Sequence, residues 1–183
     1  MSTPEPEYDF PPLTEADLPL IRRWLLEPHV RRWWDEASSA AYPEDELDKY
    51  RARIDGTDDS SDIFFIRHRG RPIGFIQCYR IDDADEYGRA LALDASAAGI
   101  DLFIGEPAEV GHGHGPKIIR AFVRDVVFAR YDVAECVIGP SVKNASAIRA
   151  YEKAGFRFFR DAVVPDEPDP EHLMRIRRDE VAP

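Results

Sequence analysis

The sequence is poor in cysteine and in long apolar runs. Only two of its 183 residues are cysteine, Cys78 and Cys136, and this favours buried thiols in a reducing compartment over a disulfide between them or a metal site. Apolar stretches such as 126–129 fall far short of the roughly 20 residues that a membrane span requires. Residues 1–7 show no basic segment followed by an apolar one, so we expect no secretory signal, no membrane partner and a cytoplasmic protein.

The sequence also has few basic residues relative to acidic ones. Lys and Arg together number 24 against 35 Asp and Glu, and the formal net charge is −11. Because nucleic-acid binding depends on clustered Lys and Arg, this balance argues against a nucleic-acid partner. An acidic protein suits a cationic small molecule, although we ascribe most of the charge to solubility.

The length and composition predict one globular domain. Apolar residues make up 44% and charged residues 32%, and no internal linker or repeat interrupts the chain. Residues 1–12 are rich in Pro and Glu and are predicted to be a flexible leader, whose end near Tyr8 joins a sheet edge. Residues 13–183 are predicted to be a single domain.

Helical patterns occur at four places in the chain. Residues 14–17, Thr-Glu-Ala-Asp, resemble a capping box that opens a helix which Pro28 ends. Pro116 is suited to the first position of a later helix, and Gly155 to closing the last one. The four predicted helices therefore follow residue 17, cover about 43–54, start at residue 116, and cover 144–154.

Strand patterns alternate with these helices and predict a mixed α/β class. A hairpin turn at 69–72 joins the first two strands, and the last two are expected to form a terminal hairpin. Residues 82–98 lack clear periodicity and are predicted to be a loop that covers a site. The predicted strands cover 63–67, 73–79, 99–105, 135–139, 156–164 and 172–177.

Glycines stand between a predicted strand and a predicted helix at residues 111–115, Gly-His-Gly-His-Gly. Free backbone amides and the positive end of a helix dipole meet at such a junction, which suits a phosphate group. The spacing is not that of a Walker loop, and the glycines come too late in the chain for an opening dinucleotide-binding unit. A flexible surface turn is the alternative.

A second segment, residues 144–156, makes the pattern specific. Its order of Asn, Ala-Ile, Tyr, Lys and Gly-Phe resembles the second signature of the GNAT superfamily of acyltransferases, and the glycine loop resembles their acyl-CoA pyrophosphate loop, with Val110 in place of the usual Arg or Gln. The resemblance covers about residues 13–177 and implies acetyl-CoA as donor. It assigns to this co-substrate Phe103, Ile104, Val110, Gly111, His112, Gly113, His114, Gly115, Lys117, Asn144, Ala147, Tyr151 and Lys153.

The same resemblance implies the fold. GNAT enzymes have a mixed, mostly antiparallel sheet of six to seven strands, flanked here by about four helices. The sheet is splayed between its fourth and fifth strands, where the pantetheine arm of CoA is admitted.

Within the superfamily the chain is similar to the branch of aminoglycoside 6'-N-acetyltransferases and siderophore-pathway acyltransferases. Asp101 stands where the aminoglycoside enzymes carry an Asp that meets the amine and the siderophore enzymes carry His, and Asp94 matches another acid of that acceptor site. A third acid is absent, because the expected Asp-Pro is Gly139-Pro140. The resemblance implies acceptor contacts from Trp33, Trp34, Gln77, Tyr79, Asp94 and Asp101.

The reaction needs few protein groups. An ammonium must lose a proton before it attacks a thioester, and Asp101 is the candidate base, although a carboxylate with an ordinary pKa near 4 acts mainly through position and charge. Backbone amides of 99–105 are candidate donors to the developing oxyanion, and Tyr151 matches the family's general acid. Packing alone would also explain Tyr151 and the pair Trp33 and Trp34, and helix capping would explain Asn144.

No other group points to different chemistry. His112 and His114 suggest a metal site, but no neighbouring ligand completes a set, so no metal is predicted. No covalent nucleophile stands out, so we expect direct transfer in a ternary complex. We predict N-acetylation of an aminoglycoside-type amine, with antibiotic resistance as its setting, by a monomer or homodimer. The alternatives are a siderophore-pathway acyltransferase acting on a lysine-derived hydroxylamine and a non-catalytic CoA sensor.

Overall fold

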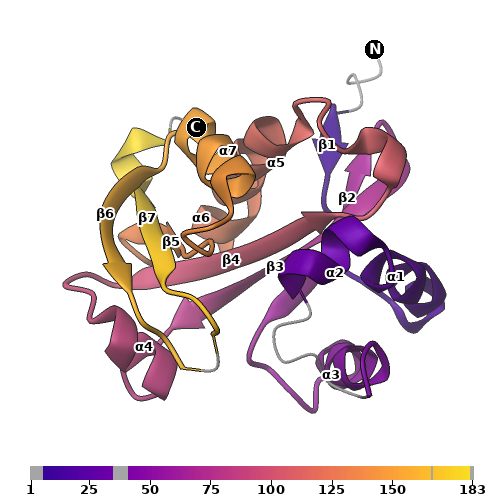
Figure 1. Ribbon diagram of the computed structural model, residues 1–183, viewed down its shortest axis with the longest axis horizontal. Coiled ribbons are helices and arrows are strands. Elements are labelled where there is room, and N and C mark those ends of the chain that lie inside the picture. The colour runs from indigo at the N-terminus through magenta and orange to yellow at the C-terminus, as the bar shows by residue number, and fades with distance from the viewer. Residues whose placement is uncertain (1–5, 35–40, 166, 182–183) are drawn as a thin grey trace. The chain divides into compact units, whose positions relative to one another are not determined.

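The computed structural model describes residues 6–34, 41–165 and 167–181 (Figure 1). Strands in this part of the chain form one sheet in the order β1-β2-β3-β4-β5-β7-β6. Contacts divide the chain into a first unit, of residues 1–77 and 102–112, and a second unit, of residues 78–101 and 113–183. The strands are β1 (Tyr8–Asp9), β2 (Asp62–His68), β3 (Arg71–Ile81), β4 (Ala97–Ile104), β5 (Glu135–Ile138), β6 (Arg157–Ala162) and β7 (Glu171–Arg177).

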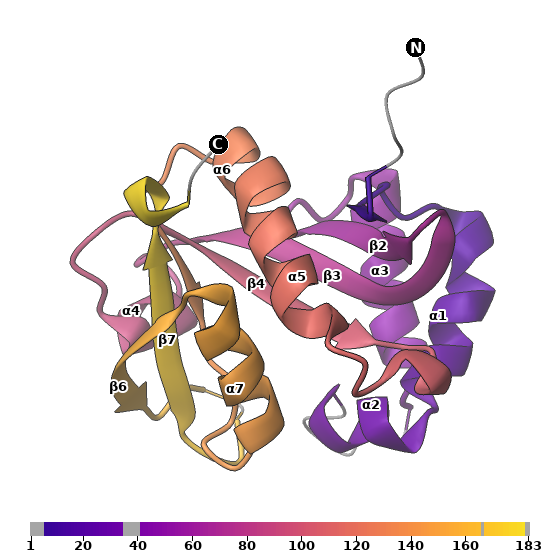
Figure 2. The same ribbon diagram turned by 90° about the horizontal axis from the view of Figure 1, so that it is seen from above.

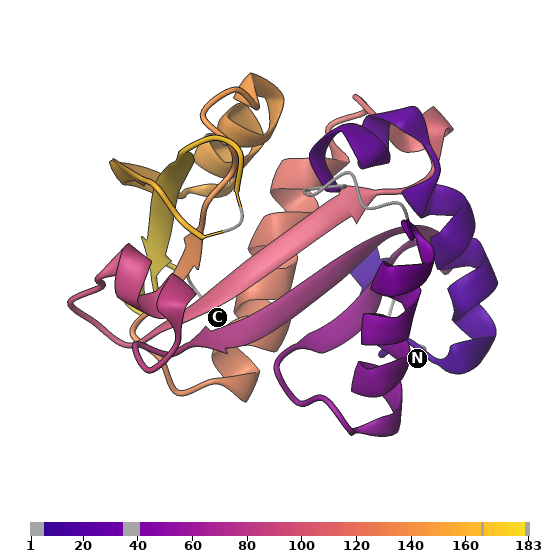
Figure 3. The same cartoon turned by 60° about the horizontal axis from the view of Figure 1, so that its bottom comes forward.

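The first unit begins with the predicted capping box. Asp17 Oδ2 accepts hydrogen bonds from the backbone amide and the hydroxyl of Thr14, at 2.8 and 2.7 Å, directly before α1 (Leu18–Leu25). Pro28 does not merely end this helix, because it opens a second one, α2 (Pro28–Trp34). The predicted helix at 43–54 is α3 (Glu44–Asp55), which lies along β2 (Figure 3).

Aromatic side chains fill the core of the first unit. Trp24 is fully buried and meets Phe65 and Phe103 edge-on, at ring-centroid distances of 5.7 and 6.4 Å. Gly105 is required beside it, since a Cβ there would overlap atoms of the Trp24 ring. This packing fixes the end of β4, where the chain leaves toward the glycine loop.

The first unit also contains the predicted hairpin. Arg69 and Gly70 both have positive φ, 50° and 77°, which is the geometry of a two-residue type I′ turn between antiparallel strands. The turn is therefore shorter than predicted, and Arg71 and Pro72 already belong to β3. At the sheet edge Tyr8 and Asp9 form β1 and pair antiparallel with β2, as expected for the end of the leader.

The second unit contains the parallel pair of β4 and β5, and β7 lies between β5 and β6 (Figure 1). The long helix starts at His114 and not at Pro116: α5 (His114–Phe122) continues through a π-helical segment (Val123–Val127) into α6 (Phe128–Arg130). Beside α5 packs α7 (Ala145–Ala154), and Gly155 closes it in the left-handed conformation as predicted (Figure 2).

The prediction of a loop at 82–98 was wrong in part. Six of these residues form α4 (Glu86–Leu91), whose first turn is capped by the Asp85 carboxylate accepting from the Gly88 amide at 2.6 Å. So short a helix carries too few apolar positions to show a period. It forms because Leu91 packs against Val137 and Leu173 in a buried cluster of the second unit.

The helices α4 and α7 cover opposite faces of the sheet in the second unit. Successive side chains of a strand point to opposite faces, so Leu173 and Ile176 of β7 face opposite ways. Leu173 packs with α4, whereas Ile176 lies against Gly155 at the end of α7. A side chain or ligand that contacts both α4 and α7 must therefore pass through the sheet. No helix within the described ranges is long and apolar enough to cross a membrane.

Candidate functional site

The glycine loop has the backbone conformation that its sequence predicts. Gly111 and Gly113 have φ of 81° and 79°, a left-handed conformation that other residues rarely adopt. A Cβ at either position would find no atom of the described residues within 4 Å, so there is open space on that side of the backbone. His112 is exposed, and α5 begins at His114. The loop thus leads an exposed chain to the positive end of a nine-residue helix, where a phosphate group can bind.

Three further residues of the predicted acyl-CoA loop vary in exposure. Val110 and Lys117 are exposed, while Gly115 is half-buried in the first turn of α5. A Cβ added to Gly115 would lie 3.5 Å from the Cβ of Ala150 on α7. The two helices of the predicted signature regions are therefore packed together at the loop.

The second signature segment is ordered by its own Asn. Asn144 Oδ1 accepts a hydrogen bond of 3.1 Å from the Ala147 amide, so the capping role of Asn144 is confirmed. Lys153 is exposed near the other end of α7, and Tyr151 is buried. The helix therefore offers one buried phenol and one exposed cation from the same signature.

The parallel ladder between β4 and β5 is short. Its recorded pairs run from Ala97↔Glu135 to Gly99↔Val137, after which β4 continues to Ile104 while β5 ends at Ile138. Asp101 lies two residues beyond the last pair. It stands at the point where the strands cease to pair, as predicted for a splay that admits a thin chain between them.

Phe103 and Ile104 belong to the first unit. The Phe103 side chain is buried in the aromatic core, stacked on Phe75 at a centroid distance of 5.4 Å. Ile104 O accepts from His29 Nε2 at 2.8 Å, and the Gly105 amide donates to Ile73 O at 2.8 Å. Gly105 therefore does not supply the oxyanion donor that 99–105 was predicted to provide, and Phe103 offers only its backbone.

Two acids and two phenols cluster in the second unit. Burial is the first cause that raises the pKa of Tyr79 well above its usual value, followed by the charge of Asp101 and then by Tyr87 and Glu171. Burial likewise raises the pKa of Tyr87, with Glu171 and Asp101 next. The Tyr87 hydroxyl donates to Glu171 Oε2 at 3.2 Å and is hydrogen-bonded to Tyr79. Both phenols therefore remain neutral donors beside the carboxylates.

Tyr151 approaches the same acid from α7. Its side chain is 6% exposed, and burial raises the pKa of its hydroxyl, with further contributions from Asp101 and Cys136. Tyr151 belongs to α7, which covers the opposite sheet face from α4, yet the charge of Asp101 still contributes to the raised pKa of its hydroxyl. A protonated hydroxyl on α7 and a carboxylate on β4 therefore influence each other electrostatically.

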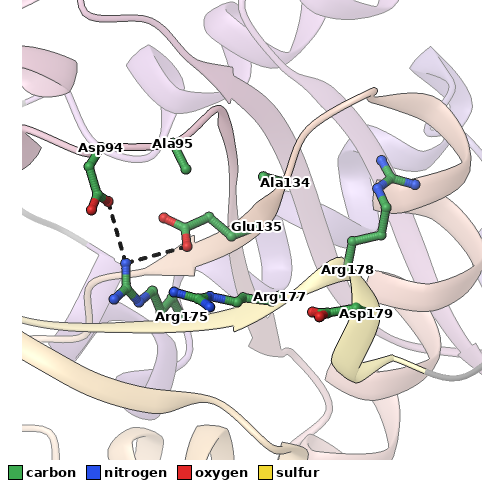
Figure 4. Close-up of a pocket in the computed structure, with 8 residues that line it drawn as sticks. All are labelled: Asp94, Ala95, Ala134, Glu135, Arg175, Arg177, Arg178 and Asp179. Atoms are coloured by element: carbon green, nitrogen blue, oxygen red, sulfur yellow. Dashed lines mark hydrogen bonds and ion pairs between the residues drawn. The ribbon is translucent and has the colours of Figure 1, made fainter.

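Asp94 belongs to a different group of charges. It lies 3.6 Å from Arg175 Nη1, which also meets Glu135 Oε2 at 3.5 Å (Figure 4). These residues line a cavity of about 600 Å³ whose other walls come from Ala95, Ala134, Arg177, Arg178 and Asp179. Asp94 therefore forms an ion pair with Arg175, whereas Asp101 acts electrostatically on the hydroxyls of Tyr79 and Tyr87. That both acids meet one cationic ligand stays a prediction.

The predicted acceptor contacts of the first unit differ in kind. Trp34 is part of the core, since its indole N–H donates to Tyr50 at 3.0 Å and its ring meets Phe103 edge-on. Trp33 is 39% exposed and carries the Arg32 guanidinium over its ring at 4.9 Å. Gln77 Oε1 accepts from Arg53 at 3.0 Å. Trp34 therefore follows the packing alternative, and Trp33 is the aromatic side chain of the pair that a ligand can reach.

Sequence reasoning missed Tyr87 and Glu171. Tyr87 lies on the helix that was predicted to be a loop, and Glu171 lies just ahead of the predicted last strand. The one available signal was Gly139 in the place of an expected acid, which suggests that another residue uses the space. Locating that residue requires the pairing of β5 with β7, which the sequence does not show.

Comparisons with known proteins agree with this geometry. Residues 14–163 match the family model of the acetyltransferase (GNAT) domain. The aminoglycoside N(6')-acetyltransferase type 1 of Klebsiella pneumoniae is 30% identical over 156 residues, which cover 85% of this chain and 77% of that protein. The structure of AAC(6')-Ib with paromomycin and acetyl-CoA is similar over 96% of both chains, with a TM-score of 0.82 at 27% identity. The spermidine N-acetyltransferase of Vibrio cholerae shares the fold, with a TM-score of 0.71 at 16% identity over 96% of this chain and 98% of that one.

Proposed function

The chain belongs to the GNAT acetyltransferase family, and from this premise we propose that it transfers the acetyl group of acetyl-CoA to a primary amine of an aminoglycoside. The observation that carries the proposal is the position of Asp101. It lies where the β4–β5 ladder stops, coupled to Tyr79 and Tyr87 and to Tyr151 from the other face. Asp101 as base and Tyr151 as acid would then act on a thioester bound where the two strands separate.

The glycine loop supports acetyl-CoA as donor. Two left-handed glycines surrounded by open space precede α5, and such backbone can approach a pyrophosphate closely. Acetyl-CoA supplies an activated acyl group, and the loop would hold its phosphates while Lys117 adds a nearby positive charge. Val110 in place of the usual side chain leaves this backbone cradle in place.

Asp101 would act on the amine. A carboxylate binds the ammonium form, accepts its proton directly or through water, and stabilises the positive charge that develops on nitrogen during attack. The neutral hydroxyls of Tyr79 and Tyr87 are hydrogen-bond donors and acceptors for the same amino sugar. Asp101 then contributes more through its position than through its basicity.

Tyr151 would return a proton to the departing thiolate. Because burial raises the pKa of this hydroxyl, it stays protonated at neutral pH and is available as a donor. The neighbouring thiol of Cys136 does not compete as a nucleophile, since burial raises its pKa and keeps it protonated. Attack by the amine itself, in a ternary complex, is therefore the direct route.

The role that follows is resistance to aminoglycosides, because acetylation removes a positive charge from the drug. We place the protein in the cytoplasm. Its two cysteines, Cys78 and Cys136, are both free and buried, as is usual in a reducing compartment.

The test is a thiol-release assay with acetyl-CoA against aminoglycosides, polyamines and lysine-derived hydroxylamines. We expect turnover of an aminoglycoside, and a fall in kcat of about 100-fold or more in Asp101→Asn with little change in the KM for acetyl-CoA. Turnover of hydroxylamines alone would assign the chain to siderophore chemistry. Binding of CoA without any turnover would identify a sensor.

A further inference from the structure

Glu171 occupies the side-chain space of residue 139. A Cβ built on Gly139 would lie 2.5 Å from Cδ of Glu171 and would overlap its Oε2. Gly139 has no left-handed φ, so its backbone accepts any L residue, and the Glu171 side chain accounts for all three of the nearest atoms. The Glu171 carboxylate can occupy this position only because residue 139 is glycine and has no side chain.

The backbone holds this arrangement firmly. Glu171 is the first residue of β7 and forms an antiparallel bridge with Ser141. On either side of it the His172 amide donates to Pro140 O at 2.7 Å, and the Val142 amide donates to Pro170 O at 3.0 Å. The side chain is 8% exposed and receives the Tyr87 hydroxyl at 3.2 Å. The carboxylate is therefore held in place before any ligand arrives.

Glu171 and Asp101 belong to the same face of the sheet. The two ladders pair Gly99 with Val137 and Val137 with Arg175, so these three residues lie on one face. Asp101 follows Gly99 by two residues in β4, and Glu171 precedes Arg175 by four in β7, so both acids lie on that face. Both carboxylates act on Tyr79 and on Tyr87, which places the two acids around one pair of phenols. A ligand ammonium at this point would meet negative charge from β4 and from β7.

We propose that Glu171 is a second carboxylate for the cationic acceptor, reaching from β7 over Gly139 to do what an acid at the end of β5 would do. This inference rests on the proposed function and extends it, since Asp101 then engages the reacting amine and Glu171 a second ammonium of the same polycation. Two carboxylates on one face select an acceptor with at least two amines, such as an amino sugar, over a monoamine.

The competing explanation is that Glu171 only anchors Tyr87. That role predicts a loss of thermal stability and no specific effect on the acceptor. Glu171→Gln separates the two roles, because the amide keeps the size of the side chain and an oxygen for the Tyr87 hydroxyl but removes the charge. Glu135→Gln is the matched control, since Glu135 is a buried acid of the same sheet that belongs to the Asp94 and Arg175 group.

The experiment measures steady-state kinetics of the wild type, Glu171→Gln, Glu171→Ala, Glu135→Gln and the double variant Gly139→Asp/Glu171→Ala. We expect the acceptor KM to rise about tenfold or more in both Glu171 variants, with the KM for acetyl-CoA unchanged. The double variant returns a carboxylate to the same space and should recover at least part of the lost affinity relative to Glu171→Ala. Glu135→Gln should leave both KM values at the wild-type level.

Each other outcome is decisive. An unchanged acceptor KM in Glu171→Gln, or equal rises for acceptor and acetyl-CoA, would overturn the inference while leaving the proposed function intact. If the double variant folds but its acceptor KM is as high as that of Glu171→Ala, a carboxylate at residue 139 cannot replace the one at residue 171, and this part of the inference is overturned. A wild-type enzyme that acetylates no polyamine of any kind would overturn the proposed function, and this inference with it.

Discussion

The Tyr87 hydroxyl donates a hydrogen bond of 3.2 Å to Oε2 of Glu171, and this contact joins α4 to the first residue of β7. Neither residue belongs to a signature of the family. Together they complete the acidic side of the candidate acceptor site, with Tyr79 and Asp101 as their neighbours.

Tyr87→Phe should weaken acceptor binding. Removing the hydroxyl frees the Glu171 carboxylate to move, so the acceptor KM should rise about threefold to tenfold, the equivalent of one ordinary hydrogen bond. Kinetics with an aminoglycoside measure this. The control is Tyr131→Phe, which removes a hydroxyl bonded to Cys78 O at 3.3 Å in the same unit. An equal effect in both variants would indicate general loosening and not a specific contact.

Tyr151→Phe should lower kcat by about 100-fold with little effect on the KM for acetyl-CoA, because the variant lacks the proton donor and keeps the ring. The wild type has a related pH dependence. Burial, Asp101 and Cys136 raise the pKa of Tyr151 above its ordinary value of 10.0, so kcat should show no fall from loss of this proton as pH rises from 7 to 10.0. An alkaline limb that starts near pH 8 and is absent from Tyr151→Phe would contradict the raised pKa of Tyr151, whereas an unchanged kcat in Tyr151→Phe would contradict its role as the proton donor.

Gly113→Ala should raise the KM for acetyl-CoA about tenfold and leave the acceptor KM unchanged. Its φ of 79° places an L residue in the left-handed region, at a cost of about 1–2 kcal/mol that the loop can relieve only by changing shape. Gly56→Ala is the control, since Gly56 has the same φ of 79° and equal open space at the end of α3. A similar rise of the KM for acetyl-CoA in both variants would show that the conformation of Gly113 has no specific role in binding acetyl-CoA.

Glu135→Gln should stabilise the protein at neutral pH. Burial raises the pKa of Glu135 above its ordinary 4.5, although Arg175 lowers it, and its Oε1 is buried without a hydrogen-bond partner among the residues that the structure describes. The charged carboxylate therefore costs folding energy, in full above its folded-state pKa, and that cost disappears as pH falls below 4.5, where both the folded and the unfolded state are protonated.

Thermal unfolding of Glu135→Gln should show a rise in Tm of about 2–4 °C at pH 7, the equivalent of about 1 kcal/mol. The difference from wild type should shrink to nothing near pH 4. A lower Tm at pH 7 would mean that the ion pair with Arg175 outweighs burial.

Local patterns in the sequence determined much of this protein. The capping box at Thr14, the cap at Asn144 and the closing Gly155 each depend on residues within one helical turn, and the structure confirms all three. The four predicted helices became α1, α3, α5 and α7, and the glycine loop adopted the left-handed backbone that only glycine accepts readily. Such features are legible in sequence because their causes lie between near neighbours in the chain.

Tertiary structure alone decided the rest. The helix α4 has too few apolar positions to be predicted from sequence periodicity. It is stabilised by the packing of Leu91 against Val137 and Leu173, which only the folded chain brings together. Likewise, Glu171 reaches Gly139 only because β7 pairs with β5 across more than thirty residues of intervening chain, and a shift of one residue would turn that carboxylate to the opposite face. The sequence by itself determined the family and the left-handed glycines of the loop, and it predicted Asp101 and Tyr151 as site residues. Which second acid joins them depends on strand register, which is set by the packing of the whole sheet.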